Sequence, residues 1–200
     1  MLRSTSHPIP VLETARLRLR GHTPADLTKC AELWGNPEVT RFIGGKPSTA
    51  EETWSRLLRY LGHWTLLGFG YWLVEERETK DFVGEVGLSD YKRELHPAFG
   101  ATPEAGWVLH PRHHGKGYAT EALRAVLEWE RTAIGSKEIG CIIAPENAAS
   151  FRVAERCGFV ESLRTIYKGS PTVILRRSGA SVSAGALDRD RAPVSASSAG

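Results

Sequence analysis

Hydrophobic residues in the first part of the chain recur with two different periods. In "ARLRLR" at residues 15–20, Leu17 and Leu19 alternate with arginines, and this period of two predicts a half-buried strand. Residues 24–34 repeat their apolar positions every three to four residues, as one face of a helix does. We expect Thr23 to cap this helix and the proline after it to open the first turn. The predicted apolar stripe is Leu27, Cys30, Ala31 and Trp34.

The same two periods continue through the middle of the chain. After a predicted loop through "GNPEV" and "GGKPS", a helix is expected to begin near Ser48 or Thr49, with two glutamates in its first turn. Its predicted apolar stripe is Trp54, Leu57, Leu58 and Leu61. The stretches "GFGYWLVEE" and "DFVGEVGLS" follow as two strands joined by the charged turn "RETK".

The remaining pattern predicts further strands and helices in alternation. The strand "EAGWVLH" leads into a strongly periodic helix from Gly117 to about Arg131, and the short apolar run at 138–144 suits a buried strand. Asn147 is expected to cap a second helix that ends at Gly158. The stretches "VESLRTIY" and "PTVILRR" are predicted to form an antiparallel pair around "KGS".

This order of elements predicts an α+β fold. The early strands follow one another closely and are expected to be antiparallel. The strand–helix–strand unit at 104–144 requires a parallel, right-handed crossover. The expected architecture is a mixed, mostly antiparallel sheet with helices packed on its faces.

Composition narrows the class of protein. The 200 residues suffice for one domain, and a net charge of +3 with scattered basic residues gives no reason to expect nucleic-acid binding. No apolar run is long enough for a bilayer span, so no membrane partner is expected. Three unclustered cysteines favour a reducing, cytoplasmic setting. We predict a flexible arm at residues 1–10, a working domain at 11–177, and a disordered tail at 178–200.

The stretch "HPRHHGKGYATEAL", residues 110–123, combines a tight glycine loop with the start of the strong helix. Amide groups at a helix N-terminus bind anions, and Arg112 and Lys116 add positive charge. Gly115 and Gly117 allow the backbone to approach a phosphate closely, although the same glycines could simply form a turn. The spacing fits neither a P-loop nor a dinucleotide-binding fingerprint, so ATP and NAD are disfavoured.

"RHHGKGYATEA" is similar to the R/Q-x-x-G-x-G/A signature of the GNAT superfamily of acyl-CoA-dependent N-acyltransferases. Four further stretches resemble the RimJ/RimL-type branch in the same order: "LETARLRLR", "FVGEVGL", "EAGWVLHPRHHGKGYATEAL" and "NAASFRVAERCGF". Together they cover nearly all of residues 11–177. The resemblance implies a GNAT fold, with a central pair of splayed parallel strands and helices on both faces.

The resemblance also implies acetyl-CoA as cosubstrate and assigns residues to it. Backbone groups of Val108 and Leu109 would contact the pantetheine arm, which would enter between the splayed strands. Asn147 would contact the pantetheine region, a role compatible with capping a helix. The residues implied at the pyrophosphate are Arg112, Gly115, Lys116, Gly117, Tyr118, Ala119 and Thr120.

The implied chemistry is direct attack of an amine on the thioester. A protonated amine cannot attack, so a general base is needed. Glu104 occupies the position where related enzymes often have a glutamate, and Glu85 is a second candidate. Many members protonate the leaving thiolate with a tyrosine, but Ala154 stands at that position here. Ser150 is the alternative acid, although it could equally be a capping residue, and a CoA thiolate can also leave without an acid.

Several alternatives remain open. The acceptor could be a protein N-terminal α-amine or a small amine such as an antibiotic, polyamine or amino-acid derivative, and residues 41–64 are expected to select it. Loss of the tyrosine also allows a non-catalytic acyl-CoA sensor. No metal is expected, because His110, His113 and His114 lack a recognised ligand spacing and are expected to flank the phosphates or face solvent. Cys157 is expected to be a buried apolar residue, and the assembly to be a monomer or homodimer.

Overall fold

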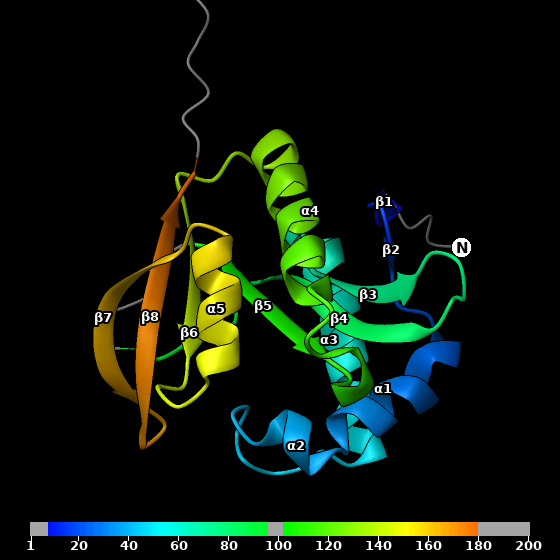
Figure 1. Ribbon diagram of the computed structural model, residues 1–200, viewed down its shortest axis with the longest axis horizontal. Coiled ribbons are helices and arrows are strands. Elements are labelled where there is room, and N and C mark those ends of the chain that lie inside the picture. Colours follow the sequence, from blue (N-terminus) through cyan, green and yellow to red (C-terminus); the bar gives the residue numbers. More distant parts are fainter. Residues whose placement is uncertain (1–7, 96–101, 180–200) are drawn as a thin grey trace, which may run out of the picture.

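A computed structural model describes residues 8–95 and 102–179 of the chain. Eight strands form one sheet in the order β1-β2-β3-β4-β5-β6-β8-β7 (Figure 1). Only β5 and β6 are parallel among these neighbours, so the predicted mixed, mostly antiparallel sheet is confirmed. The strands are β1 (Leu12–Glu13), β2 (Leu17–Arg20), β3 (Tyr71–Glu76), β4 (Phe82–Ser89), β5 (Glu104–Leu109), β6 (Glu138–Ile143), β7 (Val160–Tyr167) and β8 (Ser170–Ser178).

The two parallel strands touch only at one end. Glu104, the first residue of β5, pairs with Gly140 of β6, and this is the single paired position between them. Beyond it β5 runs away from β6 towards the lower right of Figure 1. The sheet is therefore split from the carboxyl end of β5 inward, and the two halves meet at Glu104.

Helices cover both faces of the sheet. One buried cluster joins α4 and α5 to the strands, and a second joins α1, α2 and α3 to the opposite face of β3, β4 and β5. The helices are η1 (Pro24–Asp26), α1 (Leu27–Trp34), α2 (Pro37–Thr40), α3 (Ala50–Leu67), η2 (Pro111–His113), α4 (Tyr118–Ala133) and α5 (Ala148–Arg156). None of these helices in the described ranges is long and apolar enough to cross a membrane.

Local capping explains where several of these helices begin. The Thr49 hydroxyl accepts a hydrogen bond from the Glu52 amide, and the Glu52 carboxylate accepts one from the Thr49 amide. The Asn147 side chain accepts from the Ser150 amide at the start of α5. The predicted starts of α3 and α5 are confirmed, whereas α2 forms where a plain loop was expected.

The buried stripe of α3 differs from the predicted one. Leu57 is buried as expected, but Trp54 and Leu58 are 36% and 50% exposed. Thr53 and Tyr60 are buried instead, because their hydroxyls find partners: Thr53 donates to the Thr49 carbonyl and Tyr60 to Glu85. Apolar spacing alone therefore chose the wrong side of the helix for Trp54 and Leu58.

The predicted domain limits fall close to the edges of the described chain. Residues 1–7 and 180–200, which contain most of the predicted arm and tail, lie outside the described residues. Among the described residues of the predicted arm, Ile9 packs against the main core, and the Pro10 carbonyl accepts a hydrogen bond from Trp72 Nε1 at 2.7 Å. At the other end, β8 pairs as far as Ser178. The division at 10 and 177 stays a prediction.

Candidate acetyl-CoA site

The loop between β5 and α4 places two glycines in the left-handed region. Gly115 has a φ of +74° and Gly117 a φ of +81°. Gly117 is the residue directly before α4, which begins at Tyr118. An L-residue in this conformation is strained, so glycine is required for the turn into the helix. The first amides of α4, which lack acceptors within the helix, are thereby left at the mouth of the gap between β5 and β6.

The three histidines of this loop make hydrogen bonds within it, and His113 is buried whereas His114 is exposed. His113 is only 3% exposed, and Arg112 Nε donates to its Nε2 at 3.1 Å. His114 Nε2 lies 2.9 Å from the Leu109 carbonyl, and His110 accepts from the Arg112 amide. Burial and then the neighbouring cation Lys116 hold the pKa of His113 below its usual value, which favours the neutral ring as an acceptor. His113 therefore does not face solvent, and the expectation that the histidines flank the phosphates stays a prediction.

Three cations meet at the loop. Arg112 is anchored, because its Nη2 also donates to the Phe82 carbonyl at 3.3 Å. Lys116 Nζ lies 3.4 Å from His113 Nδ1. Arg16, just before β2, donates to the Lys116 carbonyl at 3.0 Å and pairs with Glu121 of α4 at 2.6 Å. Arg16 therefore ties the glycine loop to the edge of the sheet.

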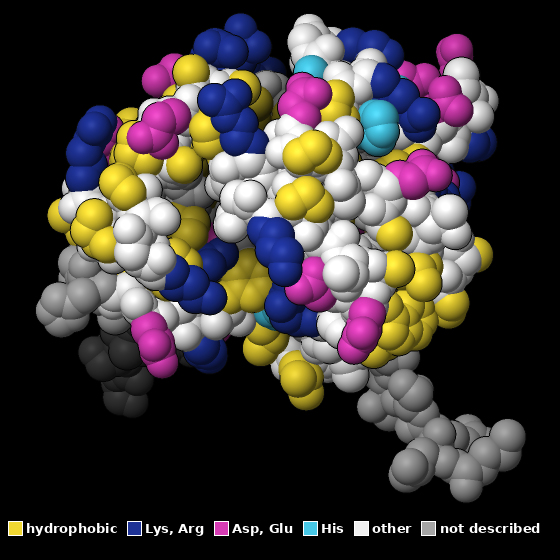
Figure 2. Space-filling view, turned by 90° about the horizontal axis from the view of Figure 1, so that it is seen from below, with side chains coloured by type: hydrophobic (Ala, Val, Ile, Leu, Met, Phe, Trp, Pro, Cys, Tyr) yellow, Lys and Arg dark blue, Asp and Glu magenta, His cyan; other side chains and the backbone are white. Residues whose placement is uncertain are grey.

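The first turn of α4 borders an open groove. The Tyr118 hydroxyl donates to Glu76 at 2.8 Å, and the Thr120 side chain is mostly buried. A hollow of about 590 Å³ lies beside Gly117 and Thr120 and is also lined by Arg124 and Arg156. Figure 2 shows His side chains at the upper right of the face seen from below, with Lys and Arg side chains next to them and Asp and Glu side chains among them. This end of the molecule is therefore suited to an anion with several phosphates.

The gap between β5 and β6 has predicted residues on both sides. Val108 and Leu109 are the last two residues of β5, the strand that diverges from β6. Asn147 and Ser150 lie beyond β6, where α5 begins. Ala119 is partly buried against the main core behind the loop. Val108, Leu109, Asn147 and Ser150 thus lie towards the carboxyl ends of the two parallel strands, and their roles stay predictions.

Glu104 lies at the closed end of the same gap. Its two oxygens accept hydrogen bonds from Arg93, at 2.5 Å from Nε and 2.7 Å from Nη2. Glu104 is 6% exposed, so this is a buried ion pair. Burial alone would lower the pKa of the Arg93 guanidinium, but the hydrogen bonds to Glu104 outweigh it and raise that pKa. The side chain predicted as the base is therefore held by a partner that the sequence pattern did not reveal.

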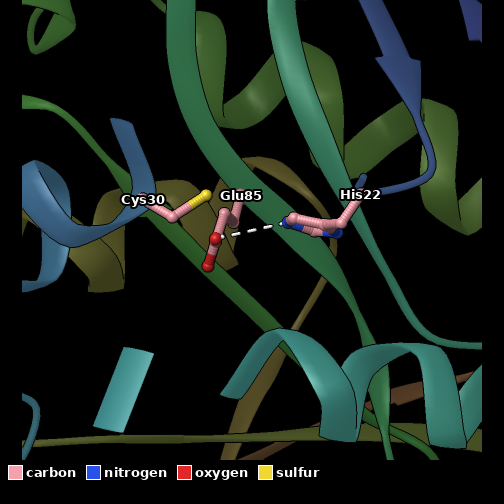
Figure 3. A group of neighbouring side chains, drawn as sticks. All are labelled: His22, Cys30 and Glu85. Carbon is pink, nitrogen blue, oxygen red and sulfur yellow. Dashed lines mark hydrogen bonds and ion pairs between the residues drawn. The ribbon is translucent and has the colours of Figure 1, made fainter. Parts of the chain in front are cut away.

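Glu85, the second candidate base, is sealed inside a different cluster. Its side chain is fully buried on β4, and Trp34 Nε1 and the Tyr60 hydroxyl donate to Oε2 at 2.9 and 3.0 Å. Figure 3 shows the His22 ring pointing at the other oxygen, with Nε2 3.3 Å from Oε1. Burial tends to raise the pKa of Glu85, but the hydrogen bond from His22 and the other donors hold it below its usual value. Glu85 is not open to a substrate.

His22, Cys30 and Glu85 also form the one group in the described part of the chain whose potential metal-ligand atoms lie within 4.8 Å of one another. Burial raises the pKa of the Cys30 thiol, so the protonated thiol is favoured. The carboxylate already accepts three hydrogen bonds from neighbouring side chains. We interpret this cluster as the attachment of α1 and α3 to the sheet.

The whole arrangement matches one family. The model of the acetyltransferase (GNAT) domain matches residues 16–160, which include the diverging strands β5 and β6 and the glycine loop. The chain belongs to the GNAT acetyltransferases. Such an enzyme takes its acetyl group from acetyl-CoA, which agrees with a cationic glycine loop beside a gap in the sheet.

Similar proteins support the assignment along most of the chain. The uncharacterized protein YkkB of Bacillus subtilis is 31% identical over 171 residues, covering 83% of this chain and 94% of YkkB. A GnaT-family acetyltransferase of Bordetella pertussis is 28% identical, with a TM-score of 0.75 over 84% of this chain and 99% of that one. The GNAT fold and the acetyltransferase activity are therefore shown for this chain.

More distant structures share the fold but are named for different acceptors. A ribosomal-protein-S5-alanine acetyltransferase of Vibrio fischeri is 18% identical, with a TM-score of 0.69 over 86% of this chain and 98% of its own. A spermidine N-acetyltransferase of Vibrio cholerae is 23% identical, with a TM-score of 0.63 over 82% and 94%. At these identities the likeness shows the fold alone, and the acceptor of this GNAT acetyltransferase is left open.

Two residues next to the candidate site were missed by sequence patterns. Arg16 and Arg93 each contact a predicted site residue from another part of the chain. Arg16 could have been noticed, because it stands in the matched "LETARLRLR" stretch. Arg93 sits in a segment with no periodic pattern, so no signal in the sequence pointed to it. Cys157 is buried as expected, with its Sγ 3.9 Å from the Thr120 carbonyl.

Proposed function

We propose that this GNAT acetyltransferase is of the RimJ/RimL type and transfers the acetyl group of acetyl-CoA to the α-amine at a protein N-terminus. The observation that carries the proposal is the loop after β5. Its two left-handed glycines lead into the N-terminus of α4 at the mouth of the gap between the parallel strands. Free helix amides next to a gap in a sheet suit a pyrophosphate that continues into a narrow arm.

The cofactor would lie along this loop and gap. Amides of Gly115, Gly117 and the first turn of α4 would hold the pyrophosphate, with Arg112 and Lys116 supplying charge. The groove beside Thr120, with Arg124 and Arg156, would receive the phosphorylated adenosine end. Remaining backbone and side-chain contacts are assigned to Tyr118 and Ala119 at the pyrophosphate and to Val108, Leu109 and Asn147 along the pantetheine.

The chemistry would take place between Glu104 and Ser150. The neutral amine attacks the thioester carbonyl, so a C–N bond forms and the C–S bond breaks. The proton lost by nitrogen passes to Glu104, directly or through water, and the Ser150 hydroxyl donates to the departing sulfur. Arg93 does not block this role, because a bidentate pair uses one lone pair on each carboxylate oxygen and leaves others free.

The charges on the sheet face beneath α1 and α3 favour an acceptor with a single α-amine over a polyamine acceptor. The three buried carboxylates on this face are already engaged: Glu75 by Arg20, Glu85 by His22 and two further donors, and Glu104 by Arg93. A polycation would gain little there. An α-amine also has a pKa near 7.8 against about 10.4 for a lysine-like amine, so at pH 7 its neutral fraction is about three hundred times larger.

Thiol release from acetyl-CoA tests this proposal with three matched acceptors. One is a short peptide with a free α-amine, the second is the same peptide with a blocked N-terminus and one lysine, and the third is spermidine. We expect the free α-amine peptide to give the highest kcat/KM. A higher value for spermidine would identify a small-amine enzyme instead, and no turnover with any amine despite acetyl-CoA binding would indicate a sensor.

A further inference from the structure

Arg93 connects the two halves of the split sheet at the point where they meet. It lies in the segment after β4, and its side chain reaches Glu104 on β5 through two hydrogen bonds. Its third nitrogen, Nη1, donates to the Tyr167 hydroxyl at the end of β7, at 3.2 Å. β4 and β5 belong to one half of the sheet and β7 to the other. Arg93 therefore fixes the closed end of the gap from both sides.

Two aromatic rings hold the guanidinium in place. It lies 4.8 Å from the centre of the Tyr91 ring and 5.2 Å from the centre of the Tyr167 ring. Cation–π contacts of this kind are strongest where water is excluded. Its side chain is 20% exposed and that of Glu104 only 7%. The pair is therefore rigid, and the direction in which Glu104 presents its remaining lone pairs is set by Arg93.

Among the described residues, Arg93 is the cation that pairs with the buried Glu104 carboxylate. A buried carboxylate without a partner is favoured in its protonated form, and a protonated acid cannot take a proton from an amine. The other groups around the pair are neutral in their usual forms or lie further out. The titratable and charged groups that surround the pair are Tyr71 on β3, Tyr91, Cys141 on β6, Tyr167 on β7 and Arg59 of α3 over Tyr91.

We propose that Arg93 is a positioning residue for catalysis, which keeps Glu104 ionised and aimed at the acceptor amine. This inference rests on the proposed role of Glu104 and names the residue on which that role depends. Arg93 itself takes no proton and touches no reacting atom. Its effect is on Glu104, a buried carboxylate at the one paired position between β5 and β6, which Arg93 holds in the form and direction that a base needs.

The test compares Arg93→Gln, Arg93→Lys and the control Arg59→Gln. Arg59 also lies over the Tyr91 ring, at 5.2 Å, but the carboxylate of Glu104 is paired with Arg93. The measurements are the pH profile of kcat/KM with the α-amine peptide and the Kd of acetyl-CoA. For Arg93→Gln we expect a fall in kcat/KM of about 10²- to 10⁴-fold and an acid limb displaced upward by about one to three pH units.

The remaining variants separate a role in ionisation from a purely structural one. Arg93→Lys keeps the charge but loses the two-pronged geometry, so we expect the acid limb to stay in place while the rate falls. Arg59 lies in the segment expected to select the acceptor, so Arg59→Gln is a control for the position of the acid limb alone, which should stay in place whatever happens to the KM of the peptide. All variants should bind acetyl-CoA within about twofold of wild type, since the loop is untouched. An unmoved acid limb in Arg93→Gln, or an equal displacement in Arg93→Lys, would overturn the proposal.

The same data distinguish this inference from the proposed function. If the wild-type enzyme gives no turnover with any amine, the proposed function fails before Arg93 is tested. If the wild type acetylates the peptide and Glu104→Gln lowers its rate while Arg93→Gln leaves the profile unchanged, only the role of Arg93 is wrong. Should Arg93→Gln fail to fold, the profile of Arg93→Lys still decides, because a displaced limb there contradicts the inference.

Discussion

At the scale of single residues, the backbone of the glycine loop matters more than its side chains. Gly115 and Gly117 have positive φ values, and a Cβ on Gly117 would meet only the Arg16 side chain at 3.6 Å. Space is therefore not the reason for glycine at this position. Glycine is needed for its conformation, because Gly117 makes the left-handed turn directly before the first amides of α4.

Replacement of Gly117 by alanine tests this point. The left-handed conformation costs an L-residue about 1–2 kcal/mol, and a loop that relaxes to avoid it moves the amides away from the pyrophosphate. We expect Gly117→Ala to weaken acetyl-CoA binding at least tenfold, measured by calorimetry. Gly169 is a matched control, because its φ is +78° and nothing lies within 4 Å of a Cβ there. Gly169→Ala should lose similar stability with an unchanged Kd, and equal Kd values for both variants would contradict the prediction.

Sequence patterns predicted site residues that stand in local motifs, and they missed the contacts that these residues make with distant parts of the chain. The glycine loop, Asn147 and Glu104 each stand in a local motif, so their places could be predicted. The pairing of Glu104 with Arg93 depends on how a segment without periodicity crosses the sheet. The opposite error concerns Glu85. Its motif suggested a candidate catalytic base, but three donors from other elements enclose its carboxylate.

At the scale of elements, the type and order of helices and strands followed from the sequence, but the buried face of α3 did not. Trp54, Leu57, Leu58 and Leu61 form a regular apolar stripe, yet only Leu57 of the first three is buried. The neighbouring Tyr60 packs inward because it can donate to a buried carboxylate on β4. A buried polar partner that lies on another element cannot be seen in the spacing of apolar residues.

Two leucines that are adjacent in the chain provide a test of this orientation. Leu57 is 2% exposed in the cluster beneath α1, whereas Leu58 is 50% exposed. We expect Leu57→Ala to lower the free energy of unfolding by about 2–5 kcal/mol and Leu58→Ala by less than about 0.5 kcal/mol. Urea denaturation of the two variants measures both values. Similar losses would mean that Leu58 is covered in solution.

The attachment of η1 and α1 to β2 should depend on pH. Asp26 accepts two hydrogen bonds from Arg20, both at 2.8 Å, and pairs with Lys29 at 2.9 Å. Burial acts to raise the pKa of Asp26, but these partners outweigh it and hold the pKa well below its usual range. A depressed pKa stabilises the fold above the unfolded value of about 3.9, and this stabilisation is lost as the pH falls towards the folded value.

We therefore expect Asp26→Asn to lower the free energy of unfolding by about 3 kcal/mol at pH 7, because a buried ion pair is broken. The difference from wild type should shrink steadily below about pH 4, as the wild-type carboxyl becomes protonated. Denaturant titrations at a series of pH values measure it. Asp81→Asn, at an exposed carboxylate, is the control and should differ little from wild type. A difference for Asp26→Asn that stays constant down to pH 2 would count against the linkage.

At the scale of the whole molecule, the sheet consists of two halves with one paired position between β5 and β6. The parallel crossover was predictable, because the strand–helix–strand unit requires it. The extent to which the two strands diverge could not be predicted, since it depends on the packing of α4 and α5 on one face and on Arg93 at the closed end. The gap that results is where the donor is proposed to enter, so the fold is least continuous at its functional site.

A ligand that fills this gap should join the two halves. Acetyl-CoA at about one hundred times its Kd adds about 2.7 kcal/mol to the free energy of unfolding whatever it contacts. Its location is reported by local hydrogen exchange. If it spans the gap as proposed, exchange should slow both at residues 110–120, after β5, and at residues 147–150, where α5 begins. Protection confined to residues 110–120 would mean that the phosphates bind at the loop while the pantetheine arm stays outside the gap.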